Sequence, residues 1–166
     1  MTRHSARAAA QTLRSPVSRR GFMMLGSGLA LGAAAITLMP GAARAAVFTE
    51  DGLGVKGYDP VAYFTEERPV RGSAEFSTDH GGATYRFASQ ANLDAFRADP
   101  ERYLPQYGGY CAWAVAQGYK APIIPEAWAV VDGKLYLNAS RGVQRRWQRD
   151  IPGFIAEANR NWPSIR

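Results

Sequence analysis

Two side chains in this sequence stand out for the chemistry they can do, the thiol of Cys111 and the imidazole of His80. Cys111 is the only cysteine among the 166 residues, and it lies in the glycine-rich and aromatic stretch PQYGGYCAWAVAQGYKAP. A lone cysteine is a metal ligand, a reactive thiol, half of an intermolecular disulfide or a small buried apolar residue. His80 is a metal ligand, a base for the thiol, or a residue of an exposed turn.

Cys111 and His80 are therefore the candidate ligands for a metal ion, either copper or zinc. Structural zinc sites have four protein ligands, so two donors are too few. Carboxylates such as Asp59, Asp79 and Glu126, or tyrosines, or a second subunit would have to supply the others. We do not expect a tight zinc site within one chain.

Aromatic residues near Cys111 and in the stretch YDPVAYF are candidates for binding a small organic molecule. Most of the large aromatic residues are expected in the core. Gly108 and Gly109 precede an expected helix start, where backbone N–H groups can face a ligand; the pair equally suits a tight turn. The candidate ligand-binding residues are Tyr58, Asp59, Tyr107, Tyr110 and Cys111.

None of the common catalytic patterns, such as G-x-S-x-G, H-E-x-x-H or a phosphate-binding glycine loop, occurs in the chain. An enzymatic function would therefore depend on Cys111 as the centre of a thiol-dependent redox protein. That chemistry needs a lowered thiol pKa and access to solvent. The remaining alternative is a structural or interaction module in which Cys111 is buried and inert.

The pattern around these residues predicts a small α+β domain with an antiparallel sheet or hairpins packed against short helices. Residues 74–89 read as a hairpin divided at Gly81-Gly82, and residues 126–138 as a hairpin with a type I′ turn at Asp132-Gly133. Helices are expected at 90–100 after Ser89, at 110–116, at 141–150 after Ser140, at 151–162 after Asp150, and as one turn after Asp59-Pro60.

Residues 1–45 have the features of a leader for the twin-arginine export route. Arg19 and Arg20 stand in the pattern S-R-R-x-F, an uncharged run covers 21–43, and Ala-Arg-Ala precedes a cleavage point near Ala45-Ala46. We expect a periplasmic protein that meets the twin-arginine translocation machinery during export and has no stable membrane association after cleavage. An uncleaved membrane anchor is the alternative.

Cleavage would remove the excess positive charge. Six of the 20 Lys and Arg residues, and none of the 14 Asp and Glu residues, lie in residues 1–45, so residues 46–166 are formally neutral. A neutral domain does not indicate nucleic-acid binding. Residues 46–166 are enough for one domain with its own core, and a single cysteine excludes an internal disulfide.

Four segments together resemble the YHS-domain family, in particular its exported bacterial members: GYDPVAYF, GATYRFASQANLDAFRADPERYLPQYGGYCAWAV, AWAVVDGKLYLN and DIPGFIAEANRNWP. The resemblance covers about residues 50–163. It implies a YHS-like domain over 46–166 that binds a small ligand or a metal ion.

Metal-handling members of that family carry cysteines in the elements D-P-V-C and Y-x-F-C-S-x-x-C. This chain has Ala62, Ala88 and Asn92 at those positions. Soft metal ions select thiolate and thioether ligands, which these side chains do not provide. The resemblance therefore supports the fold and argues against the family's thiolate metal site in this chain.

Overall fold

A computed structural model describes residues 46–166 of the chain. The predicted leader and the alternative membrane anchor fall on residues 1–45, outside the described residues. Within 46–166, no helix is both long and apolar enough to cross a membrane.

Six strands run through the described residues and form two separate sheets. They are β1 (Thr49–Glu50), β2 (Leu53–Gly54), β3 (Ser73–His80), β4 (Ala83–Phe87), β5 (Ile124–Val131) and β6 (Lys134–Asn138). The first sheet has the order β1-β2-β4-β3, and the second is the β5-β6 hairpin. Every pair is antiparallel except β2 and β4, which run parallel.

Both predicted hairpins are confirmed, with their turns at the indicated residues. Gly81 and Gly82 join β3 to β4 with φ angles of 62° and 101°, which glycine adopts without strain. Asp132 and Gly133 join β5 to β6 with φ angles of 50° and 70°, the left-handed pair that a type I′ turn requires. Local turn chemistry therefore sets the register of both hairpins.

The helical segments are α1 (Ala62–Thr65), α2 (Gln90–Ala98), α3 (Pro100–Tyr103), α4 (Ala112–Ala116), α5 (Arg141–Trp147) and α6 (Ile151–Ile165), with 3₁₀ turns η1 (Val55–Gly57) and η2 (Gln106–Gly109). The side chains of Ser89, Ser140 and Asp150 cap α2, α5 and α6, as the sequence predicts. Several boundaries differ from the prediction, since α2 ends at Ala98, α5 at Trp147 and α6 at Ile165. Pro100 begins a further helix, and the helix near Cys111 begins only at Ala112.

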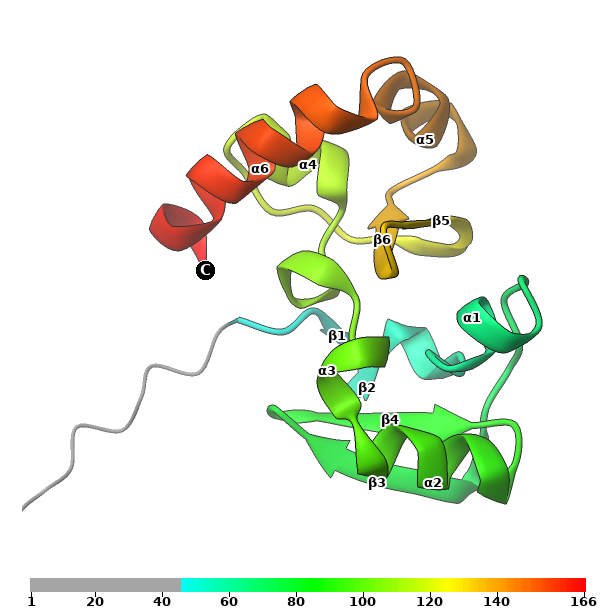
Figure 1. Ribbon diagram of the computed structural model, residues 1–166. Helices are drawn as coiled ribbons and strands as arrows, with labels where there is room; N and C mark the ends of the chain where they lie inside the picture. Colours follow the sequence, from blue (N-terminus) through cyan, green and yellow to red (C-terminus); the bar gives the residue numbers. More distant parts are fainter. Residues whose placement is uncertain (1–45) are drawn as a thin grey trace, which may run out of the picture. The chain divides into compact units, whose positions relative to one another are not determined.

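The helices divide between the two sheets. In Figure 1, α2 lies across β3 and β4, while α4, α5 and α6 accompany the β5-β6 hairpin. The α+β prediction is confirmed, but the two-residue strands β1 and β2 and the parallel pairing of β2 with β4 are additional to it. A two-residue strand contains no alternation for a sequence pattern to reveal.

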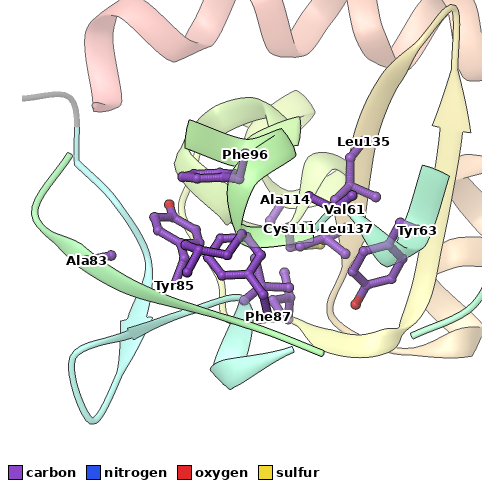
Figure 2. Packing of buried hydrophobic residues seen from close by; sticks show 13 residues of the cluster. Val61, Tyr63, Ala83, Tyr85, Phe87, Phe96, Cys111, Ala114, Leu135 and Leu137 are labelled. Carbon is purple, nitrogen blue, oxygen red and sulfur yellow. The ribbon is translucent and has the colours of Figure 1, made fainter. Parts of the chain in front are cut away.

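Two groups of buried apolar residues form the core. In the first, the rings of Tyr85 and Phe87 pack on Phe96 with centroids 5.3 and 5.0 Å away, as Figure 2 shows. Cys111 belongs to the same group, next to Ala114. The second group surrounds the wholly buried Trp147 and connects α4, α5 and α6 to β6.

Candidate functional site

The carboxylate of Asp59 is wholly buried and accepts four hydrogen bonds. Its Oδ1 accepts from the backbone N–H of Val61 at 2.8 Å and of Ala62 at 3.3 Å. Its Oδ2 accepts from the N–H of Ala88 at 2.8 Å and from the side-chain amide of Asn92 at 2.6 Å. Asp59 thus caps α1 and ties it to the junction between β4 and α2.

The positions at which the resemblance would place cysteines therefore meet at one point. Ala62, Ala88 and Asn92 all contact the Asp59 carboxylate, although they come from three different segments. Their side chains are two methyl groups and an amide, and the amide is already bonded to the carboxylate. This donor set does not fit a copper or other soft metal ion. Asp59 itself is fully engaged in the fold and has no exposed surface to offer a ligand.

Cys111 is a buried thiol held between two backbone segments. Its side chain is 1% exposed, and its sulfur accepts the N–H of Ala139 at 3.3 Å and faces the side-chain oxygen of Asn138 at 3.8 Å. Burial raises the pKa of the Cys111 thiol, and nearby backbone N–H groups offset this only in part. The thiol is therefore protonated at neutral pH, which argues against a reactive or metal-binding thiolate.

His80 ends β3 at the tip of the first hairpin. Its Nε2 lies 3.7 Å from Oε1 of Glu101 on α3, and its ring meets Phe96 edge-on with centroids 5.8 Å apart. The contacts of His80 and Cys111 involve different residues, so the structure does not join the two predicted metal ligands. Within 46–166, no group of three or more His, Cys, Asp or Glu residues is arranged to hold a metal ion.

A cleft of about 320 Å³ opens beside His80, between the tip of the β3-β4 hairpin and the segment that runs from α3 through η2. We call it the His80 cleft. It is lined by Val47, His80, Gly81, Tyr85, Glu101, Leu104, Pro105, Gln106, Tyr107 and Gly108. The volume of the His80 cleft lies at the lower end of the range of volumes for pockets that hold small organic molecules.

Tyr85 gives the cleft an unsatisfied polar group. The residue is only 2% exposed, and it lines the cleft. The hydroxyl groups of Tyr63 and Tyr107 donate to Pro125 and Asn159, but the Tyr85 hydroxyl has no such partner among residues 46–166. Burial, with a smaller contribution from the charge of Glu101, raises the pKa of Tyr85 to about 12. The hydroxyl therefore stays neutral and can donate or accept one hydrogen bond.

The three tyrosines that the sequence predicts as ligand-binding residues, Tyr58, Tyr107 and Tyr110, do not lie together. Tyr107 lines the His80 cleft, although its hydroxyl points to Asn159 on α6 at 3.0 Å. Tyr58 lies under the guanidinium of Arg71, and the ring of Tyr110 packs against Phe48. Of the five ligand-binding candidates, only Tyr107 lines the cleft.

Sequence reasoning missed Tyr85 and Glu101 as residues that line the cleft with His80. Tyr85 is part of the predicted hairpin, and its alternation with Phe87 indicates a buried ring. Glu101 lies 21 positions after His80 in the chain, and nothing in the local pattern indicates that the two side chains meet. Only the packing of α3 beside the hairpin tip reveals the site.

Residues 61–107 match the family model of the YHS domain. A YHS domain is therefore present over these residues. The matched segment of the YHS domain runs from the start of α1 into η2, so it includes every residue that lines the His80 cleft except Val47 and Gly108. Cys111 and the second hairpin lie beyond it. No curated protein and no solved structure matches the chain.

Proposed function

We propose that this protein is a binding module whose YHS domain holds a small organic molecule in the His80 cleft. The observation that carries the proposal is Tyr85, whose side chain lines the cleft and whose hydroxyl has no hydrogen-bond partner among the described residues. Such a hydroxyl can donate a hydrogen bond to a ligand group, or accept one from it, in place of solvent. A ligand group in the cleft would supply that partner.

The composition of the cleft supports the same function. Leu104, Pro105 and Val47 provide an apolar wall, while Glu101 and Gln106 add polar groups. Small-molecule sites combine a mostly apolar surface with a few polar groups that orient the ligand. The donor set around Asp59 and the protonated thiol of Cys111 favour neither a bound copper or zinc ion nor redox chemistry.

An NMR titration with benzyl alcohol, a neutral probe small enough for the cleft, tests this function. We expect the amide signals of Gly81 and Gly108 to shift, and Tyr85→Phe to weaken binding about fivefold through the loss of one hydrogen bond. Tyr119→Phe, at an exposed ring outside the cleft, is the matched control and should leave the affinity unchanged. Unshifted cleft signals, or shifts confined to the hollow beside Tyr63 and Trp128, would contradict the proposal.

We further propose that the module works in the periplasm after export through the twin-arginine machinery. The pattern S-R-R-x-F and the Ala-Arg-Ala site support this, together with the loss of all excess positive charge on cleavage. The intact mass of the protein recovered from the periplasm tests it. A chain that begins at Ala46 is expected, and a chain that keeps residues 1–45 would contradict it.

A further inference from the structure

We infer that the His80 cleft selects a small organic cation, a molecule with an amine or similar positively charged head and a short apolar body. This inference rests on the proposed function, because it names the class of ligand for the same cleft.

The charges around the cleft have one sign. Glu101 is the acidic residue in its lining, and neither Lys nor Arg lines it. A second hollow at the hairpin tip shares His80 and Gly81 with the cleft, and its lining contains Asp79 but again neither Lys nor Arg. Basic residues are as frequent as acidic ones in residues 46–166, so their absence from both linings makes this surface locally acidic.

The carboxylate of Glu101 is free to meet a ligand. Its side chain is 83% exposed, and within 46–166 its ion-pair partner is His80, which carries charge only when protonated. With the imidazole neutral, Glu101 forms no ion pair with any cation of residues 46–166. A bound ammonium group would provide one, whereas a bound carboxylate would be repelled.

Tyr85 lies within the same electrostatic environment. Tyr85 and Glu101 both line the cleft, and burial and then the Glu101 charge raise the pKa of the Tyr85 phenol. The phenol oxygen can accept a hydrogen bond from an ammonium group while Glu101 supplies the opposite charge. Leu104 and Pro105 then face the apolar body of the ligand.

Three probes with the same ring test the inference: benzylamine is positive, benzyl alcohol is neutral and benzoate is negative. In NMR titrations of the full chain we expect benzylamine to bind about fivefold more tightly than benzyl alcohol, as for a partly exposed ion pair, and benzoate to bind most weakly. The preference should shrink as salt is added. Glu101→Gln should remove the preference, so that benzylamine and benzyl alcohol bind this variant with about the same affinity.

The matched control is Glu75→Gln, at an exposed position of β3 outside the cleft lining, which should preserve the preference. If benzyl alcohol or benzoate binds in the cleft as tightly as benzylamine, the cation inference is overturned while the proposed binding function stands. A preference for benzylamine that survives Glu101→Gln would also overturn it, because the carboxylate would not be its source. If none of the probes shifts the cleft signals, both proposals are overturned.

Discussion

Asp59 is a single buried carboxylate that connects three segments of the YHS domain. Burying an isolated charge is costly, but four hydrogen-bond donors surround this one, and such bonds to charged groups are strong. The bonds from Ala88 and Asn92 hold the junction between β4 and α2 against the start of α1. The chain therefore stabilises the same junction with hydrogen bonds.

Replacing Asp59 with asparagine should destabilise the fold. Asp59→Asn keeps the shape but puts an NH₂ group against N–H donors, so we expect a loss of about 3 kcal/mol in the free energy of unfolding. Urea denaturation measures it. Asp99→Asn is the control, because Asp99 is exposed and its side chain caps no helix. Equal stabilities of the two variants would show that the Asp59 carboxylate is not structurally important.

The thiol of Cys111 should be inert in the native protein. Because it is 1% exposed with a raised pKa, we expect iodoacetamide to modify it at least 100-fold more slowly in the folded than in the urea-unfolded chain. Mass spectrometry over time measures the two rates. Rapid modification of the folded protein would restore the thiol-dependent redox interpretation.

The same raised pKa gives a pH dependence with a definite sign. The folded state favours the neutral thiol, so this stabilisation is complete below the ordinary thiol pKa of about 8.5 and is lost as pH rises above it. Between about pH 8.5 and 10, before tyrosines ionise, wild-type stability should fall more steeply than that of Cys111→Ala. Parallel curves from urea denaturation at each pH would be the contrary result.

At the scale of elements, the His80 cleft depends on where η2 meets the segment before β1. The N–H of Phe48 donates to the carbonyl oxygen of Gly108 at 2.9 Å, which holds Val47 against the cleft. Gly108 has a φ of 60°, and a Cβ there would lie 2.1 Å from the carbonyl oxygen of Ala46. Glycine is therefore required at this position for both its backbone conformation and the close approach.

Gly108→Ala should displace the segment before β1 and alter the cleft. Gly118→Ala is the matched control, since Gly118 has a φ of 86° but open space around it. Both variants lose about 1–2 kcal/mol from the left-handed conformation, and only Gly108→Ala should lose more and shift the amide signals of Val47 and Gly81. Urea denaturation and an amide NMR spectrum measure these effects. Indistinguishable variants would mean that this contact does not shape the cleft.

The elements also show what the sequence can and cannot predict. Gly81-Gly82, Asp132-Gly133 and the helix cap Ser140 act on residues within a few positions, so their turns and caps were predictable. The pairing of β2 with β4 and the approach of Glu101 to His80 join distant parts of the chain. Those contacts depend on how whole elements pack, which no local pattern encodes.

At the scale of residues 46–166 as a whole, the metal site and the small-molecule site that the sequence suggests have different outcomes. The three positions at which metal-handling members carry cysteines meet in this chain, but they surround a carboxylate that is already satisfied. The surface of the matched segment carries instead a cleft lined by the Tyr85 side chain and by an exposed carboxylate. We propose that this chain keeps the YHS framework and binds a small molecule at the hairpin tip.

A crystal structure of the protein grown with benzylamine and with zinc ions tests that claim most directly. We expect electron density for the amine in the His80 cleft, with its nitrogen within hydrogen-bonding distance of the Glu101 carboxylate and the Tyr85 hydroxyl, and no metal density near Asp59. An empty cleft together with a zinc ion beside Asp59 or Cys111 would contradict the account.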